Sequence, residues 1–167
     1  HGGEVTVLTV GPDSAADAIR KALSMGADKA VHVVDDAMHG ACAPQTSAVL
    51  AAALQQMSFD IVLCGAESTD GQLSVMPALL AERLGIPQLS GARKLTVEGG
   101  VARVERQTDG GYWALEAPLP AIVSTWDTIN EPRYPSFKGI MAAKKKPVET
   151  KTLADLGLDA STVGLAN

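Results

Sequence analysis

Stretches of β-branched and apolar residues alternate with helical stripes through the first half of the chain. Strands are predicted at Glu4–Val10, Lys29–Val34 and Ile61–Cys64. Each is followed by a polar or glycine-containing break, and then by helical periodicity at residues 15–25, 44–57 and 73–84. Repeated strand–helix units with short connections favour a parallel sheet covered on both faces, with all strand ends on one rim. The pattern therefore predicts an α/β fold.

After Pro87 a period of two replaces the helical period. Alternating runs occupy residues 94–97, 101–107, 112–117 and 120–125, and the first three are separated by two Gly-Gly turns. Such turns between alternating runs predict antiparallel strands, here a β meander attached to the core. The composition shifts again at Asn130, so we divide the chain into an α/β domain with its meander, residues 1–129, and a C-terminal arm, residues 130–167.

The turn after the third predicted strand is the first candidate site. Residues 65–74 are polar and contain two glycines, and a helix is predicted to follow them. In open α/β sheets, ligands bind beyond the carboxyl ends of strands, where helix N-termini present free N–H groups. A nucleotide phosphate would fit there. The alternative is an ordinary connection in which Thr69 or Asp70 caps the helix, and the chain contains neither a P-loop motif nor a GxGxxG motif.

Net charge, hydropathy and cysteine content limit the classes of function that this chain can have. The 167 residues carry a net charge of −5, which disfavours nucleic acid as a partner. No apolar run is long enough for membrane insertion and no signal-peptide pattern opens the sequence, so we expect a cytoplasmic or, in a eukaryote, mitochondrial matrix protein. Two cysteines, Cys42 and Cys64, suggest neither a disulfide framework nor a metal cage, and Cys64 is expected in the core.

No catalytic constellation can be assembled from the sequence. His32 lies in a strand pattern and is expected to be a packed residue, and His39 lacks neighbours at a metal-binding spacing. Glu105 and Arg106 occupy adjacent strand positions, so they point to opposite faces and do not pair with each other. We therefore expect neither catalytic nor metal-ligating residues.

The segment after Asn130 is the second candidate site. It combines apolar residues with a lysine run, namely Phe137, Ile140, Met141, Lys144, Lys145 and Lys146. A solvated tail is one interpretation. The other is a protruding arm that offers an apolar anchor beside positive charge to an acidic partner.

Several strings together resemble the beta subunit family of electron transfer flavoproteins (EtfB/FixA). They are residues 19–28, 65–71, 104–111, 130–134, 140–146 and 155–157, in family order and spacing. The resemblance implies a three-layer α/β/α fold with a mostly parallel sheet, like that of adenine nucleotide alpha hydrolases. It also implies that a further strand and helix precede His1 and that a tail follows Asn167.

In function, the resemblance implies an electron carrier subunit rather than an enzyme. The chain would pair with an alpha subunit that carries FAD, accept electrons from acyl-CoA or other flavin dehydrogenases, as in fatty acid β-oxidation, and pass them to ETF-quinone oxidoreductase and the respiratory chain. Family members usually hold structural AMP in the beta subunit, and bifurcating members hold a second FAD there. The matching cofactor positions are Val10, Gly65, Ala66, Glu67, Ser68, Thr69, Asp70, Gly71, Gln72, Leu73 and Ser74.

The resemblance also assigns roles to two surfaces. The family's partner-docking arm corresponds to Arg133, Tyr134, Phe137, Ile140, Met141, Lys144, Lys145 and Lys146, with Phe137 as the anchor. The strand around Arg106 and Gln107 would approach the FAD-bearing subunit. Leu73-Ser74-Val75 replaces the usual Thr-Gly-Gln, and Gln107 stands where relatives often carry a carboxylate.

Two other classes share the predicted core. A stand-alone adenine-nucleotide-binding regulatory domain of the universal-stress type has no need of the arm at residues 130–146. An ATP-cleaving synthetase is expected to show a glycine- and serine-rich phosphate loop, which this chain does not contain.

Overall fold

The computed structural model describes residues 2–69 and 71–165. They form two compact units. Unit 1 contains the residues up to Ala53 and those from Pro132 onward, and unit 2 contains Leu54–Glu131.

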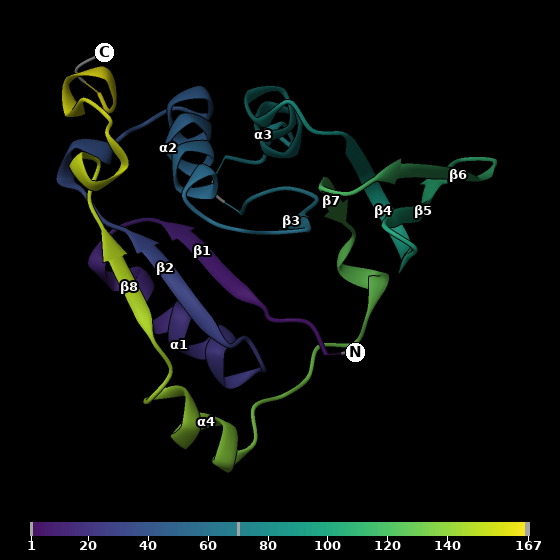
Figure 1. Ribbon diagram of the computed structural model, residues 1–167, viewed down its shortest axis with the longest axis horizontal. Helices are drawn as coiled ribbons and strands as arrows, with labels where there is room; N and C mark the ends of the chain where they lie inside the picture. Colours follow the sequence, from purple (N-terminus) through teal and green to yellow (C-terminus); the bar gives the residue numbers. More distant parts are fainter. Residues whose placement is uncertain (1, 70, 166–167) are drawn as a thin grey trace. The chain divides into compact units, whose positions relative to one another are not determined.

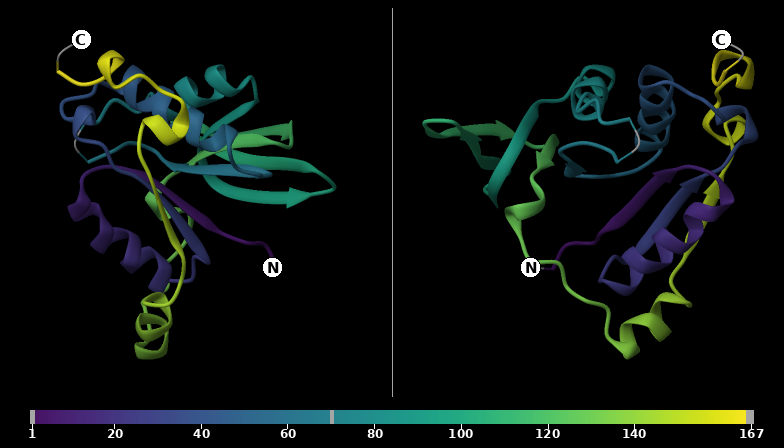
Figure 2. Two further views of the ribbon diagram at one scale, coloured as in Figure 1. Left: turned by 60° about the vertical axis from the view of Figure 1, so that its left-hand side comes forward. Right: turned by 180° about the vertical axis from the view of Figure 1, so that it is seen from behind.

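Unit 1 is built on a parallel sheet of three strands. The order is β1-β2-β8, with β1 at Thr6–Val10, β2 at Lys29–Val33 and β8 at Val148–Lys151 (Figure 1). Helix α1, Ala16–Ser24, packs on β1 and β2, and helix α4, Phe137–Ala143, packs on α1 (Figure 2). Short 3₁₀ turns flank these elements at Asp13–Ala15 (η1), Asp36–Met38 (η2), Ala154–Leu156 (η4) and Ala160–Thr162 (η5).

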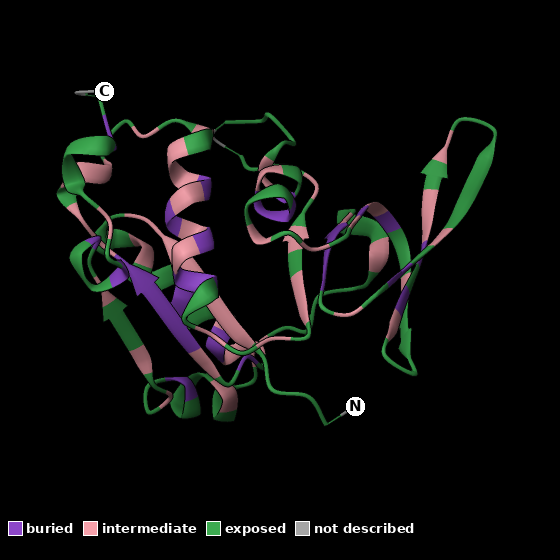
Figure 3. Cartoon of the chain, turned by 45° about the horizontal axis from the view of Figure 1, so that its top comes forward, coloured by how far each residue is buried: buried purple, intermediate pink, exposed green. Residues whose placement is uncertain are grey.

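Two apolar clusters hold unit 1 together. Helix α2, Ala43–Gln55, contributes Val49 and Ala53 to a cluster with Val33 of β2 and with Leu153, Leu156 and Val163 from the C-terminal segment. The second cluster lies under α1 and contains Ile19, Leu23, Ala27, Ala30 and Ala143. Strand β2 is therefore buried along most of its length, as Figure 3 shows.

Unit 2 is a mixed sheet of five strands in the order β3-β7-β4-β5-β6. Their bounds are Ile61–Gly65 (β3), Gln88–Glu98 (β4), Val101–Thr108 (β5), Gly111–Pro118 (β6) and Ala121–Thr125 (β7). Strand β7 runs parallel to both β3 and β4, whereas β4, β5 and β6 pair antiparallel. Helix α3, Met76–Leu84, packs on β7 and β4, and a 3₁₀ turn, Asp127–Ile129 (η3), follows β7.

The pairing of β4 is irregular near its start. The register against β7 shifts between Leu89 and Ala92, and Gly91 there has φ +68°. From this bulge onward, Ala92 to Glu98 of β4 pair antiparallel with β5. The core of unit 2 contains Leu89, Ala92, Ala102, Val104, Ala117 and Val123.

These observations confirm the α/β class, the parallel strands and the two Gly-Gly hairpins, consistent with a three-layer α/β/α fold. Three predictions were wrong. The run at 120–125 is not a fourth meander strand, because β7 pairs in parallel between β3 and β4. Helix α3 begins at Met76 rather than Leu73, and Leu63 of β3 is 59% exposed instead of buried.

Two elements were missed. Helix α4 and strand β8 lie in the segment interpreted as a tail or arm. Strand β8 is short and mostly polar, so its sequence lacks the apolar run by which the other parallel strands were found.

Candidate functional site

The turn between β3 and α3 carries most of the predicted nucleotide-site residues. Gly65 ends β3, and Glu67, Ser68, Thr69, Gly71, Gln72, Leu73 and Ser74 are all exposed, while Ala66 is half-buried. Asp70, which the sequence also assigned to this site, lies outside the described residues. The polar groups of the turn are therefore open to a ligand.

Backbone conformation makes this turn unusual. Gln72 and Ser74 have φ +49° and +54°, the left-handed region that side chains other than glycine seldom adopt. The Ser74 hydroxyl donates to Oε2 of Glu67 at 3.1 Å, and the Gln72 N–H donates to the Ser68 carbonyl at 3.2 Å. Such strained non-glycine residues cluster at ligand-binding segments.

The capping alternative does not hold for Thr69. Val75 occupies the N-cap position of α3, and no side chain there accepts a hydrogen bond from the helix. The first N–H groups of an α-helix have no partner within the helix. Pro77 in this first turn has no N–H, so the start of α3 retains only part of the donor set that the sequence analysis expected for a phosphate.

Val10 ends β1 in unit 1 and is half-buried against the cluster around Val33. The next residue, Gly11, donates its N–H to the Val33 carbonyl at 3.1 Å and accepts a hydrogen bond from Nε2 of His32 at 3.1 Å. Val10 and the Gly65–Ser74 turn thus each follow the end of a parallel strand, in separate units. That both contact one nucleotide stays a prediction.

The apolar part of the arm is a packed helix, α4, and the lysine run follows directly after it. Ser136 caps α4, because its Oγ accepts a hydrogen bond from the Gly139 N–H at 3.1 Å. Ala143 is buried against α1, whereas Phe137 and Tyr134 are 80% and 88% exposed. Ile140 and Met141 are also exposed. The segment therefore presents apolar side chains outward from a fixed base.

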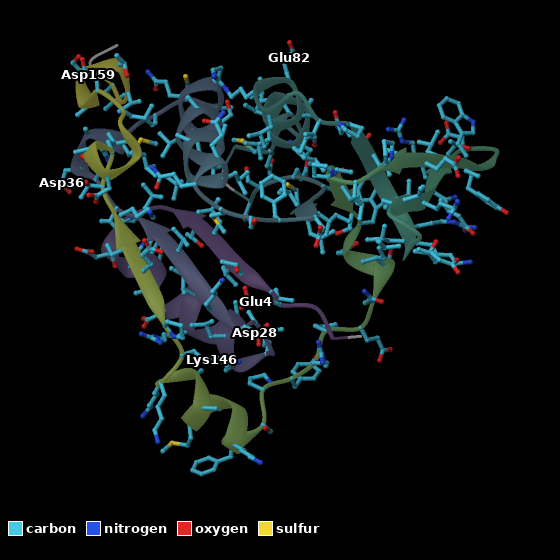
Figure 4. The ribbon with its side chains drawn as sticks, in the orientation of Figure 1. Glu4, Asp28, Asp36, Glu82, Lys146 and Asp159 are labelled. Carbon is cyan, nitrogen blue, oxygen red and sulfur yellow. The ribbon has the colours of Figure 1, made fainter. Side chains whose placement is uncertain are left out.

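Reciprocal hydrogen bonds fix that base. Nη1 of Arg20, on α1, donates to the carbonyls of Ala143 and Lys146 at 2.9 and 3.0 Å. Nζ of Lys146, labelled in Figure 4 where α4 leads into β8, donates to the Leu23 carbonyl at 3.0 Å and to the Ala27 carbonyl. Cations stabilise the carbonyl end of a helix, so each side chain supports the end of the other's helix.

The lysines of the run differ in position. Lys144 and Lys145 are exposed, while Lys146 is half-buried and bonded to α1. Arg133 approaches Gly26, where its guanidinium would lie 3.6 Å from an added Cβ. The arm thus contains outward-facing and inward-facing cations that sequence alone does not distinguish.

The strand around Arg106 and Gln107 carries a second group of polar contacts. Arg106 donates from Nε to the Ser90 carbonyl at 2.7 Å and also contacts the Ser90 hydroxyl. On the other face, Glu105 pairs with Arg93 at 2.8 Å and with Lys94 at 3.3 Å. The prediction that Glu105 and Arg106 do not pair with each other is confirmed.

Sequence reasoning missed Arg93 as the centre of this face. It pairs with Glu105, donates to Oε1 of Gln107 at 3.4 Å, and lies 4.5 Å over the Tyr112 ring. Hydrogen bonding from Arg93, with further help from Lys94, lowers the pKa of Glu105 below its ordinary value. Cross-strand neighbours of this kind depend on register, which the sequence did not fix.

The remaining candidate groups are structural. His32 is 4% exposed and bonded to the Gly11 carbonyl, which confirms it as a packed residue. Burial raises the pKa of the Cys64 thiol, so it is held as the neutral thiol. Within residues 2–69 and 71–165, no three His, Cys, Asp or Glu side chains form a group suited to a metal ion. No helix in the same described ranges is long and apolar enough to cross a bilayer.

Fold and sites together define an α/β protein with a polar, strained turn at the end of a parallel strand and a helix that presents apolar side chains outward before a lysine run. The family model of the electron transfer flavoprotein domain matches residues 1–156. The chain belongs to that family, as its motifs predicted.

Curated relatives support this assignment over almost the whole chain. Proteins of Mycobacterium bovis and Mycobacterium leprae are 57% and 58% identical to it over 166 residues, and a protein of Thermoanaerobacterium thermosaccharolyticum is 41% identical over 165 residues. All three are named electron transfer flavoprotein subunit beta. The matches cover 99%, 99% and 98% of this chain, which spans 62%, 62% and 64% of the relatives' lengths.

Proposed function

We propose that this chain is the main part of the small subunit of a heterodimeric electron transfer flavoprotein. The observation that carries the proposal is the 57% identity over 99% of the chain to a protein named electron transfer flavoprotein subunit beta. The subunit would associate with an alpha subunit that holds FAD. It would act as an electron carrier without catalytic residues of its own.

The turn at Gly65–Ser74 is proposed to hold the phosphate of structural AMP, or of a second FAD. Its donor set fits such a group, since Ser68, Thr69 and Ser74 supply hydroxyls and the start of α3 supplies N–H groups. Among the described residues of the turn, Glu67 is an unfavourable neighbour for a phosphate, because its carboxylate carries negative charge and accepts a hydrogen bond from the Ser74 hydroxyl at 3.1 Å. A phosphate would accept that hydrogen bond in place of Glu67. Val10, at the end of β1 in the other unit, is proposed separately as a nucleotide contact.

The arm at Arg133–Lys146 is proposed to dock the electron donors, acyl-CoA or other flavin dehydrogenases. Phe137 would be its anchor, since an exposed aromatic ring on a fixed helix can fill a partner's pocket at little entropic cost. Electrons would then leave through ETF-quinone oxidoreductase toward the respiratory chain. The FAD supplies the redox chemistry, and this chain's residues position the complex.

The strand around Arg106 and Gln107 is proposed to contact the alpha subunit. On the face opposite Arg106, Arg93 contacts both Glu105 and Gln107, so it would orient these two side chains toward a partner.

The test is to express the complete protein with its large-subunit partner, purify the complex, and quantify the FAD and AMP released per heterodimer. One FAD with one AMP is expected. Two FAD would indicate a bifurcating type. Absence of both flavin and a stable complex would contradict the proposal and favour the regulatory nucleotide-binding class.

A further inference from the structure

A hollow lies between α1 and α4, on the surface of unit 1. Its volume is about 460 Å³. Its lining combines apolar residues with basic and hydroxyl-bearing ones, namely Ile140, Ala143, Pro135, Arg20, Lys21, Lys144 and Ser24. Three of these seven residues, Arg20, Lys21 and Ser24, come from α1, which lies outside the proposed docking arm.

The walls of the hollow are held in place by the packing of the two helices. Arg20 and Lys146 bond across the helix pair in both directions. Gly139 of α4 lies so close to α1 that an added Cβ would be 2.8 Å from the Ser24 carbonyl oxygen. Because the helices meet this closely at one point, their spacing beside it is preset, and a partner need not order the walls on binding.

The lining of the hollow is positively charged, whereas the chain as a whole is negatively charged. Three of the lining residues are cationic and none is acidic, although the whole chain carries a net charge of −5. Asp17 lies one turn before Lys21 on α1 but does not line the hollow. A local positive rim on an acidic chain favours a negatively charged partner surface and steers its approach.

We propose that this hollow is the second half of the docking surface, and that it receives an apolar side chain projecting from an acidic surface of the partner flavin dehydrogenase. The inference rests on the proposed function. Phe137 then enters the partner, while the partner enters the hollow, so that each protein supplies one anchor and one pocket. Lys21 and Lys144 surround the incoming side chain and face the partner's carboxylates.

A variant at Lys21 can distinguish docking at the hollow from docking through the arm alone. It lies on α1, its ammonium has no hydrogen bond or ion pair among the described residues, and it lines the hollow. Arg20 is less suitable as a test, since its guanidinium also holds α4. Lys29 provides the control because it belongs to the same unit, has a side chain that is 45% exposed in an ion pair with Glu4, and does not line the hollow.

The experiment uses the full-length heterodimer and measures the second-order rate constant for flavin reduction by an acyl-CoA dehydrogenase. Four forms are compared, namely wild type, Lys21→Glu, Lys29→Glu and Phe137→Ala, at low and at high ionic strength. Lys21→Glu is expected to lower the rate constant about tenfold at low salt, since charge reversal at a docking rim acts mainly on association. The difference should shrink as salt screens the charges.

The outcomes separate the two proposals. Equal rate constants for Lys21→Glu and Lys29→Glu, with a slow Phe137→Ala, would overturn the hollow and leave the arm in place. If Phe137→Ala is also as fast as wild type, docking through the arm fails as well. A slow Lys21→Glu whose deficit does not change with salt would contradict a charge-steered surface.

Discussion

Arg20 of α1 and Lys146, just beyond the end of α4, join the two helices by hydrogen bonds in both directions. The Arg20 guanidinium donates at 3.0 Å to the carbonyl of Lys146, and the Lys146 ammonium reaches back to the end of the helix that carries Arg20, at the Leu23 carbonyl. Each cation therefore adds a hydrogen bond at the carbonyl end of a helix, Lys146 at Leu23 of α1 and Arg20 at Ala143 of α4. The arm that we propose for docking owes its position to this exchange.

Replacing Arg20 should loosen the arm. We expect Arg20→Ala to lower the free energy of unfolding by about 1–2 kcal/mol, because two charge-assisted hydrogen bonds are lost at a partly exposed site. Urea unfolding of the complete protein measures the loss. Lys145→Ala serves as the control, since its side chain is exposed and has no bond among the described residues. Equal midpoints for the two variants would remove the structural role of Arg20.

Close helix packing at Gly139 gives a second prediction. Alanine normally favours a helix by about 1 kcal/mol over glycine. Here the added Cβ would lie 2.8 Å from the Ser24 carbonyl oxygen, so α4 must shift, at a cost of about 1–3 kcal/mol for overpacking. We therefore expect Gly139→Ala to destabilise the protein despite the better propensity.

The matched control for that experiment is Gly110→Ala. Nothing lies within 4 Å of a Cβ added at Gly110. Thermal unfolding should show a lower midpoint for Gly139→Ala alone. A midpoint for Gly139→Ala at or above that of wild type would show that the helices are not in contact there.

The sequence predicted those elements whose apolar residues form a local pattern. Strand β2 was found from its nearly continuous apolar run, and helix α2 from apolar residues that recur at the helical period. Strand β8 has no such period, and its pairing with β2 depends on residues more than a hundred positions away. The direction of β7 likewise depends on which strands it joins, which the alternation of its residues does not encode.

The sequence predicted which segments carry polar or basic residues, but it did not predict the backbone conformation or the contacts of the individual residues. The polar turn was found from its breakers and glycines, but the left-handed conformations of Gln72 and Ser74 have no signal in their residue types. Three consecutive lysines read as one basic run, yet Lys146 alone lies within reach of the α1 carbonyls. The structure therefore separates Lys146, which is bonded to α1, from the two exposed lysines before it.

Ser74 tests the proposed phosphate turn. If its hydroxyl donates to a bound phosphate in place of Glu67, Ser74→Ala removes one charge-assisted hydrogen bond, and AMP affinity should fall about tenfold or more. Isothermal titration of nucleotide-depleted heterodimer with AMP measures the change. Ser58→Ala, at an exposed position of the same unit outside the turn, should bind as wild type does. Unchanged affinity in Ser74→Ala would exclude the hydroxyl from the site.

The last prediction concerns acid sensitivity at the start of η4. The carboxylate of Asp155 accepts hydrogen bonds from the Thr152 N–H at 2.7 Å and from the Thr152 hydroxyl at 2.8 Å. These bonds, the backbone one first, hold the pKa of Asp155 below its ordinary value. The stabilisation is therefore fully present above the unfolded pKa of about 3.9, and it is lost as pH falls through the lowered folded value.

Removing the titrating group should remove that part of the pH dependence. We expect Asp155→Asn to be less stable than wild type at neutral pH and to lose less stability on acidification, because its side chain does not take up a proton. Urea midpoints measured between about pH 7 and pH 3 reveal the change, since the stabilising carboxylate titrates at and below its unfolded pKa. Asp109→Asn makes the same change of charge in the exposed β5–β6 turn and should leave the slope close to that of wild type. Parallel curves for wild type and Asp155→Asn would show that the Thr152 bonds do not distinguish the charged carboxylate from the neutral amide.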